Sequence, residues 1–418
     1  MKANTKIEIG SAAFKADPYP IYARLRAEEP VCKVALPDGQ DAWLITRYDD
    51  VAMVLKDERF VKNRFNVMSR EQLAELPWIP KMFLPLLKNM LDLDPPDHTR
   101  LRALVQNAFS PRLVDAMQGR IESLTTELLD QLERRPNADL IHDFALPIPT
   151  TIIAEMLGVP VKDRHKFHRW SGRLISANSR QGILLAVPAV WMFMRYIRNM
   201  VAARRAKPKD DLVTALVGAQ DDGGKLSDDE LLAMIGLLIV AGHETTVNLI
   251  GSGMLALLEH PDQLDRLRRD PSLIKPAVEE LLRYTSPVET GTERFSREDL
   301  TLGGVTIKKG ETVYAAIASA NRDERQFPDP DVLNISRSPN RHLAFGLGIH
   351  FCVGAPLARL EGQIAIGALV SRLADLRLSV PASTLRWRPG LVLRGLKSLP
   401  VEFTPVKTPS RPPEPAAV

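Results

Sequence analysis

The sequence predicts a mainly helical protein with a minor β-sheet region, and three observations lead to this fold class. First, apolar residues recur at helical spacing through residues 98–109, 111–133, 150–157 and 190–206. Second, Ser227-Asp228-Asp229-Glu230 forms a capping box before the apolar run 231–242, so a long helix should begin there and end at His260-Pro261. Third, strand-like runs are short and confined to two regions, near residues 31–45 and 299–318.

Turn residues and prolines mark the ends of the remaining elements. Residues 18–29 predict a helix, and the runs 31–36 and 42–45 predict two strands joined by the turn Pro37-Asp38-Gly39. Further helices are expected over residues 261–269, 272–284 and 356–373. Residues 299–318 should form strands, with turns at Gly303-Gly304 and Lys309-Gly310.

The chain of 418 residues is expected to form one large domain. No long Gly/Ser-rich or Pro-rich linker divides its middle. We therefore assign residues 1–404 to a single domain. Residues 405–418 carry five prolines in fourteen positions, and this tail is expected to be disordered.

Composition excludes several classes of partner. The net charge of +4 is spread along the chain without a recognisable nucleic-acid motif, so we expect no nucleic acid partner. The longest apolar run, residues 231–242, is too short to span a bilayer, and the N-terminus lacks a signal-peptide core. We therefore expect a cytoplasmic monomer without a membrane anchor. A solvated surface explains the basic charge, although local basic patches could also dock an acidic protein.

The most informative stretch surrounds a single cysteine, in Phe345-Gly346-Leu347-Gly348-Ile349-His350-Phe351-Cys352-Val353-Gly354. Its glycines allow sharp turns and a close approach of the backbone to another group. Cys352 precedes a predicted helix that Pro356 can start, and free N–H groups at a helix N-terminus favour a thiolate. The alternative interpretation is a buried, inert cysteine in a Gly-rich turn, which we adopt for the other cysteine, Cys32.

This stretch resembles the haem-binding signature of the cytochrome P450 family, FxxGxHxCxG. All five fixed positions match, and a chance match in a chain of this length has a probability on the order of 10⁻⁴. The resemblance implies a cytochrome P450 fold and a haem b cofactor (iron protoporphyrin IX), with Cys352 as the axial iron ligand. It also implies that Phe345, Gly348 and Gly354 contact the haem.

A second match lies upstream of the cysteine, in Glu280-Leu281-Leu282-Arg283. The spacing of three residues places Glu280 and Arg283 on one helix face. These residues resemble the family's ExxR pair, which a later arginine joins, and Arg337 occupies that place here. The resemblance implies a structural network of charge-assisted hydrogen bonds that holds the haem pocket. Taken alone, the pair could equally lie on a helix surface.

A third match lies within the long helix, in Ala241-Gly242-His243-Glu244-Thr245-Thr246. An acid and an alcohol in an apolar helix are costly without a role, and threonine can bond back to the i−4 carbonyl. The stretch resembles the oxygen-binding kink of the family. By that resemblance, Glu244 and Thr245 are the catalytic acid–alcohol pair that relays protons to O2. The alternative is a helix defect satisfied by local bonds.

Four cations are candidates for binding the two haem propionates. His98 and Arg102 are four residues apart and share a helix face. Arg294 and His350 match two further propionate contacts of the family. Any one of them alone would more often be a surface cation, but together they suit a dianionic cofactor.

The resemblance implies a monooxygenase that inserts one oxygen atom from O2 into a C–H bond, by hydroxylation or a related epoxidation. The chain has no flavin fingerprint, and its two cysteines cannot hold a ferredoxin-type cluster. We therefore expect electrons from a separate ferredoxin or flavodoxin with its reductase. The expected docking face combines four basic residues near the cysteine, namely Arg100, Arg112, Arg341 and Arg359.

The segments that contact substrate in the family are apolar here, which indicates a mid-sized or large lipophilic substrate such as a fatty acid, terpenoid, steroid or macrolide. Glu289 and Thr290 are candidate polar anchors for it. The apolar candidates are Phe65, Met68, Trp78, Ile79, Phe83, Leu84, Met90, Trp170, Leu174, Ile183, Leu184, Trp191, Phe193, Val240, Val288 and Val392.

Three alternative functions remain open at this stage. A peroxide-driven peroxygenase of the same family would replace the acid–alcohol pair, so Glu244 and Thr245 count against it. A haem-binding sensor or carrier would keep Cys352 without needing that pair. A helical scaffold without haem would require the cysteine signature to be a coincidence.

Overall fold

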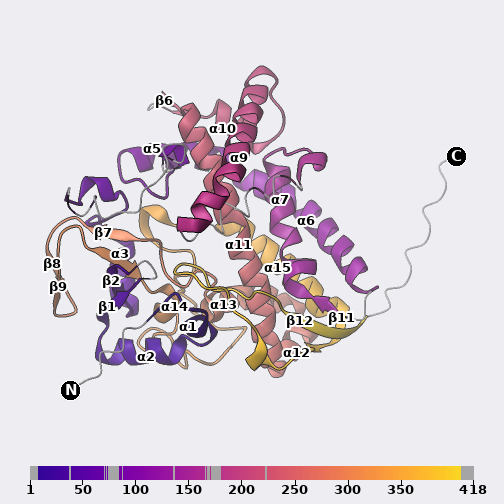
Figure 1. Cartoon of the computed structure of the whole chain (residues 1–418). Coiled ribbons are helices and arrows are strands. Elements are labelled where there is room, and N and C mark those ends of the chain that lie inside the picture. The colour runs from indigo at the N-terminus through magenta and orange to yellow at the C-terminus, as the bar shows by residue number, and fades with distance from the viewer. Residues whose placement is uncertain are drawn as a thin grey trace.

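The computed structural model describes residues 8–36, 39–69, 71, 73, 84–86, 88–134, 137–164, 166, 170, 180–221 and 224–405. Helices dominate this part of the chain, and the strands gather in small sheets (Figure 1). The principal helices are α1 (Ala12–Ala16), α2 (Tyr19–Glu28), α3 (Tyr48–Lys56), α5 (Asp97–Ala108), α6 (Pro111–Leu132), α7 (Pro147–Met156), α9 (Arg180–Ala206), α10 (Leu212–Gly218), α11 (Asp228–Glu259), α12 (Pro261–Arg269), α13 (Ile274–Thr285), α14 (Ile317–Ala320) and α15 (Ala355–Arg372).

The largest sheet joins the N-terminal strands to strands from the second half of the chain. Its order is β1-β2-β10-β7-β3, from β1 (Val31–Ala35), β2 (Asp41–Ile45), β10 (Thr312–Ala315), β7 (Arg294–Ser296) and β3 (Phe60–Val61). β1 and β2 form the predicted antiparallel hairpin, and β10 pairs with β2 in parallel. The sheet therefore brings β7 beside β3, and both lie close to the candidate site.

Three smaller sheets complete the β structure. A three-stranded sheet has the order β11-β12-β4, from β11 (Leu373–Leu378), β12 (Pro400–Pro405) and β4 (Ala138–Asp139). The other two are hairpins, β5 (Gln220–Asp221) with β6 (Gly224–Lys225) and β8 (Leu300–Leu302) with β9 (Val305–Ile307). Pro405, the last residue of β12, pairs with Leu373. Residues 406–418 lie outside the described residues.

The predicted fold class and most predicted elements are confirmed. The capping box at Ser227 is formed, and α11 runs unbroken until His260. Two predictions were wrong in extent. α9 begins at Arg180 rather than near residue 190, because Pro188 lies inside the helix and interrupts the sequence pattern. Residues 317–318 belong to α14 and not to a strand.

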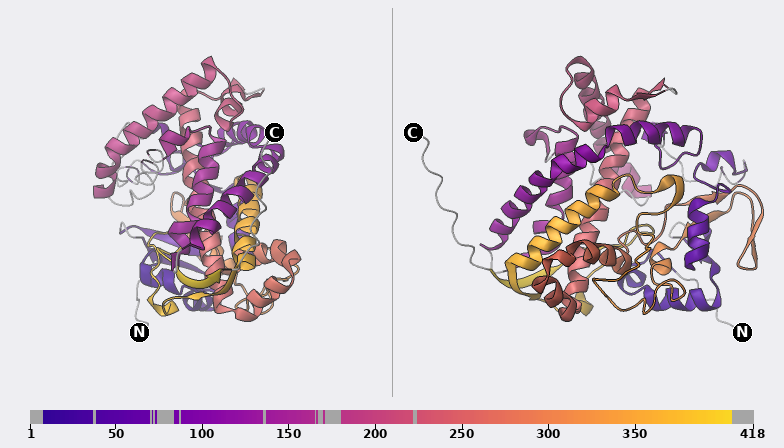
Figure 2. Two further views of the ribbon diagram at one scale, coloured as in Figure 1. Left: turned by 90° about the vertical axis from the view of Figure 1, so that its right-hand side faces the viewer. Right: turned by 180° about the vertical axis from the view of Figure 1, so that it is seen from behind.

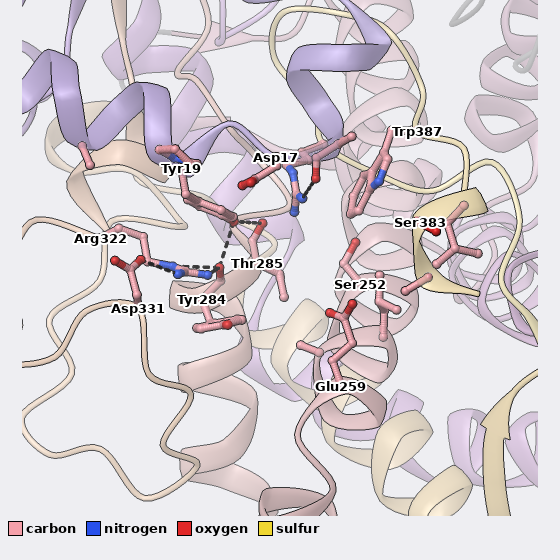
Figure 3. Close-up of a pocket in the computed structure, with 18 residues that line it drawn as sticks. Asp17, Tyr19, Ser252, Glu259, Tyr284, Thr285, Arg322, Asp331, Ser383 and Trp387 are labelled. Carbon is pink, nitrogen blue, oxygen red and sulfur yellow. Dashed lines mark hydrogen bonds and ion pairs between the residues drawn. The ribbon is translucent and has the colours of Figure 1, made fainter. Parts of the chain in front are cut away.

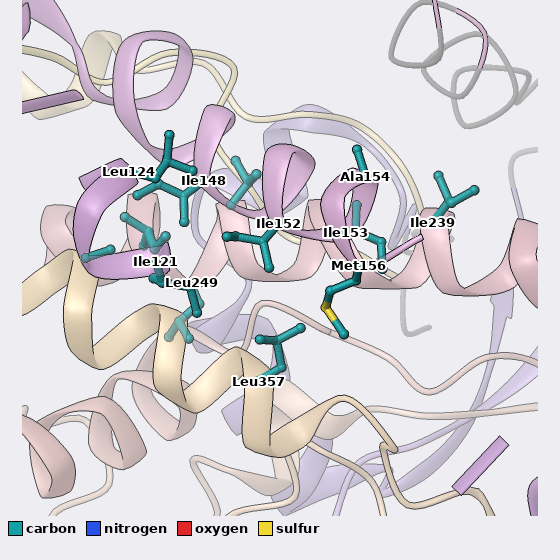
Figure 4. Close-up of a cluster of buried hydrophobic side chains, with 14 of the residues drawn as sticks. Ile121, Leu124, Ile148, Ile152, Ile153, Ala154, Met156, Ile239, Leu249 and Leu357 are labelled. Atoms are coloured by element: carbon teal, nitrogen blue, oxygen red, sulfur yellow. The ribbon is translucent and has the colours of Figure 1, made fainter. Parts of the chain in front are cut away.

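α11 is the central helix of the core, and Figure 2 shows it passing through the helical part of the molecule. Among the described residues it alone is long and apolar enough to cross a membrane, but 61% of that apolar window is buried inside the fold. It is therefore a core helix. Figure 4 shows its side chains packed with those of α6, α7 and α15, including Ile121, Ile152, Leu249 and Leu357.

Candidate active site

Cys352 lies in the turn between a short 3₁₀ helix, Gly348–His350, and the N-terminus of α15. Its backbone N–H donates to the carbonyl of Phe345 at 2.9 Å, which closes the turn. Burial raises the pKa of the Cys352 thiol, and hydrogen bonds from the backbone N–H groups of Gly354 and Ala355 oppose that shift. The side chain nevertheless keeps an exposed surface. Cys352 is thus an exposed residue just before α15, and the N-terminus of that helix favours negative charge on the sulfur.

The loop reaches this position because one glycine permits it. Gly348 has φ +70, and a Cβ there would lie 2.9 Å from the carbonyl oxygen of Leu55 at the end of α3. Any other residue would strain the backbone and push the loop away from α3. The sequence predicted that a glycine here allows a close approach to another group. In the structure, the group that Gly348 approaches is the end of α3.

His98, Arg102, Arg294 and His350 come from α5, β7 and the cysteine loop. The rings of His98 and His350 lie 4.3 Å apart between centroids. Both ring nitrogens of His98 and Nε2 of His350 are buried without a hydrogen-bond partner. Burial and the positive charges nearby together lower the pKa of His350 to about 2, and these charges belong to Arg294, His98, Lys62 and Arg102. Within the described residues, neither Arg102 nor Arg294 forms an ion pair.

Such a cluster is electrostatically incomplete. Buried polar atoms without partners are costly, and among the described residues Asp94 is the one carboxylate that offsets the charges of both Arg294 and His98. Burial also lowers the pKa of Arg294 to about 10, although its guanidinium donates to the carbonyls of Phe60 and Leu55, each at 3.3 Å. A dianionic group would satisfy both the charges and the free imidazole nitrogens. The donor set and the nearby thiol therefore fit a haem with two propionates.

Lys62 belongs to the same cluster, and the sequence analysis missed it. Its Nζ donates to Thr292 Oγ1 at 2.6 Å and to the Glu293 carbonyl at 2.5 Å. Burial and the charge of Arg294 lower its pKa to about 8. No motif surrounds this lysine, and only the pairing of β3 with β7 brings it near Arg294.

Glu280, Arg283 and Arg337 are brought together in a buried network. Arg283 donates to Glu280 through Nε and Nη2, each at 2.8 Å, and both side chains are 0% exposed. Arg337 Nε donates to Glu280 Oε1 at 3.0 Å. Asn340 and the backbone N–H of Asn334 also donate to this carboxylate.

The two guanidinium groups of this network donate in turn to the chain that leads to the cysteine loop. Arg283 donates to the carbonyls of Asn321 and Pro330, and Arg337 to that of Pro328. One carboxylate thus fixes α13 to that segment through hydrogen bonds from four groups, which restricts the movement of both.

Glu244 and Thr245 lie on α11. Thr245 Oγ1 donates to the carbonyl of Ala241 at 2.9 Å, which is the predicted i−4 bond. Glu244 Oε1 lies 3.2 Å from Nη1 of Arg388, a partner that the sequence did not indicate. α11 is continuous across this stretch, so the acid and the alcohol sit on an intact helix.

A further acidic side chain contacts the residue that follows this pair. Glu361 on α15 is buried, and its carboxyl hydrogen-bonds the side chain of Thr246. Burial raises the pKa of Glu361 to about 8, and the bond to Thr246 opposes the shift. Sequence analysis missed it because a single glutamate in the α15 pattern is indistinguishable from a surface residue.

Glu361 makes stability depend on pH. Its pKa is about 8 in the fold against an ordinary 4.5, so the stability gained by a neutral carboxyl is complete below pH 4.5. That stability is lost as pH rises towards 8, at about 1.4 kcal/mol per unit. We expect Glu361→Gln to flatten this decline in urea unfolding of the haem-loaded protein between pH 5 and 8. Glu298→Gln at an exposed site is the control, and equal slopes in the two variants would contradict the assignment.

Several residues proposed for substrate binding are placed elsewhere. Glu289 is wrong as a substrate anchor, because its Oε2 lies 2.9 Å from Lys15 Nζ and its Oε1 accepts from Tyr22 at 2.8 Å. Thr290 donates to the carbonyl of Leu391. Phe65, Leu84 and Trp191 are exposed. Trp78, Ile79, Phe83 and Leu174 lie outside the described residues, as do the side chains of Ile183 and Leu184.

Two of the four arginines in the expected docking face are paired with acidic residues of the same chain. Arg100 pairs with Glu230, and Arg359 with Glu279 at 2.7 Å. Arg112 and Arg341 are exposed and form no ion pair within the described part of the chain. The positive charge of this face therefore rests mainly on two of the four arginines.

A separate cavity of about 590 Å³ lies beside the C-terminal half of α11, two turns beyond Glu244 (Figure 3). Its floor is buried, with Ser252 of α11 beside Trp387. The guanidinium of Arg394 lies 3.8 Å from the centroid of the Trp387 ring. The cavity marks where the segment around Trp387 meets α11.

Comparisons with known proteins find relatives that cover most of the chain. The family model described as Cytochrome P450 matches residues 27–384. The polyketide biosynthesis cytochrome P450 PksS of Bacillus subtilis is 46% identical, over 94% of this chain and 97% of PksS. The 6-deoxyerythronolide B hydroxylase of Saccharopolyspora erythraea is 43% identical, over 95% and 98%. The solved structure of PksS superposes with a TM-score of 0.89 at 45% identity, covering 95% of this chain and 100% of that one.

Proposed function

The chain belongs to the cytochrome P450 family, and from this premise we propose that it inserts one atom of O2 into a C–H bond of a mid-sized or large lipophilic substrate. As a member of this family, it is a haem b oxygenase. The observation that carries the proposal is the acid–alcohol pair, Glu244 and Thr245, on the central helix of a fold that also presents an accessible thiol, Cys352.

The chain's own residues have distinct tasks in this proposal. Cys352 would hold the haem iron through Sγ, and the N–H groups of Gly354 and Ala355 would stabilise the charge on sulfur. His98, Arg102, Arg294 and His350 hold the propionates, while Phe345, Gly348 and Gly354 shape the loop against the haem. The bound haem supplies the oxidising chemistry. Glu244 takes up protons from the solvent side and Thr245 hands them on through its hydroxyl.

We also propose a substrate class and a source of electrons. Relatives carry names that refer to polyketide biosynthesis and to hydroxylation of 6-deoxyerythronolide B, and we assign this chain a lipophilic substrate of the polyketide class. Electrons come from a separate ferredoxin or flavodoxin and its reductase, docked over Arg112 and Arg341. We place the protein in the cytoplasm as a monomer, with residues 1–404 acting as one domain and no nucleic acid partner.

Isotope labelling tests the proposed reaction. With ¹⁸O2, a reductase and a ferredoxin, each product molecule should gain one labelled oxygen atom. Hydrogen peroxide without the electron chain should support far less turnover, because the acid–alcohol pair serves O2 and not peroxide. Efficient peroxide turnover without dependence on the electron chain would instead identify a peroxygenase, and binding without any product would identify a carrier.

The same assay defines the role of Thr245. Thr245→Ala removes the hydroxyl that passes the proton, so product per electron pair should fall by at least about tenfold while released peroxide rises. Thr301→Ala, at an exposed position of β8, is the control and should match the wild type. An unchanged ratio of peroxide to product in Thr245→Ala would remove Thr245 from the proton path.

A further inference from the structure

Glu244 is held by one cation from a distant part of the chain. Arg388 Nη1 lies 3.2 Å from Glu244 Oε1, across 144 residues of sequence. Within the described residues, Arg388 is the one ion-pair partner of Glu244. The two side chains are 36% and 20% exposed, so the pair stands between the protein interior and solvent. A pair this exposed contributes little to stability, which points to a different role.

The segment that carries Arg388, residues 387–396, is fixed against the same face of α11. Its ends pair with each other through Trp387 and Leu396, and Arg388 N–H donates to the carbonyl of Gly395 at 2.9 Å. A Cβ on Gly395 would overlap the side chain of Asn248, so only glycine allows this approach. Asn248 is four residues after Glu244 and shares its helix face. Segment 387–396 therefore presents Arg388 to Glu244 from a rigid support.

The middle of segment 387–396 is tied to other parts of the fold. Lys15 Nζ donates to the carbonyl of Leu391 at 3.1 Å, and the carbonyl of Val392 accepts the backbone N–H of Glu289 at 2.8 Å. Val288 and Leu393 also pair as an isolated bridge. Val288 and Val392 are two of the residues proposed to line the substrate pocket. One segment thus joins the candidate substrate wall to the partner of Glu244.

We propose that Arg388 is a positioning residue that holds the Glu244 carboxylate in one orientation on α11 for proton uptake from solvent. The guanidinium offers several donors in a fixed plane, which restricts the rotation of a carboxylate that would otherwise turn freely. This inference rests on the proposed monooxygenase function and extends it.

The test compares Arg388→Gln and Arg388→Lys with Arg386→Gln in the haem-loaded protein. Arg386 is an exposed neighbour with no ion pair in the described residues, which makes it a matched charge control. In Arg388→Gln, product per electron pair should fall about threefold to tenfold, with more peroxide and a larger solvent deuterium isotope effect. Substrate affinity should stay unchanged, and Arg388→Lys should recover part of the yield because it keeps the cation.

A second readout does not depend on turnover. The carboxylate infrared band lost in Glu244→Gln should shift in Arg388→Gln and stay in place in Arg386→Gln. If the wild type oxygenates and Arg388→Gln matches Arg386→Gln in both readouts, or raises the yield, Arg388 does not position Glu244. If the band shifts but the wild type yields no labelled product, the positioning stands and the proposed function fails.

Discussion

Replacing Cys352 with alanine is expected to abolish thiolate ligation of the haem and to lower oxygenation by several orders of magnitude. The thiolate donates electron density to iron and favours O–O cleavage, and no neutral side chain replaces that effect. The reduced carbon monoxide difference spectrum should lose the long-wavelength Soret band that marks a thiolate ligand. Product formation measured alongside should fall below detection.

Cys32→Ala is the matched control, because Cys32 is the only other cysteine of the chain. Cys32 lies buried in β1, and burial raises its pKa to about 11, so it remains a thiol at neutral pH. This variant should keep the thiolate band and full activity. A thiolate band that survives in Cys352→Ala and disappears in Cys32→Ala would overturn the assignment of the ligand.

Features predicted correctly from the sequence are those whose signal is local. The capping box at Ser227, the hairpin of β1 and β2 and the pairing of Glu280 with Arg283 each depend on residues a few positions apart. The Thr245 bond to Ala241 is of the same kind. The spacing of the two partners in the sequence is enough to bring them into contact, whatever the rest of the fold is.

Contacts that the sequence could not reveal join residues far apart in the chain. Glu361 meets Thr246, and Lys62 meets Glu293, only because helices and strands pack in three dimensions. Glu289 was misassigned for the same reason. Its charge suggested a substrate anchor, whereas a lysine near the N-terminus folds onto it. Which residue becomes the partner at such a position depends on how distant segments pack together. A single sequence gives little information about that packing.

The buried Glu280 network should give the largest loss of stability on mutation. Glu280→Gln keeps the shape of the side chain but leaves Arg283 and Arg337 as buried cations without a counter-charge. Breaking a buried pair in this way costs about 3–5 kcal/mol. We expect that loss in the urea-induced unfolding free energy of the haem-loaded protein, together with weaker haem retention, because the network supports the chain before the cysteine loop.

A surface pair with the same spacing isolates the effect of burial. Arg268 and Asp265 also lie three residues apart on a helix, with Asp265 61% exposed. Asp265→Asn should cost less than about 1 kcal/mol, because water replaces the lost partner. Comparable losses in the two variants would mean that Glu280 acts as an ordinary helix pair. A large loss in Glu280→Gln alone would show that the buried charge itself holds the cysteine loop in place.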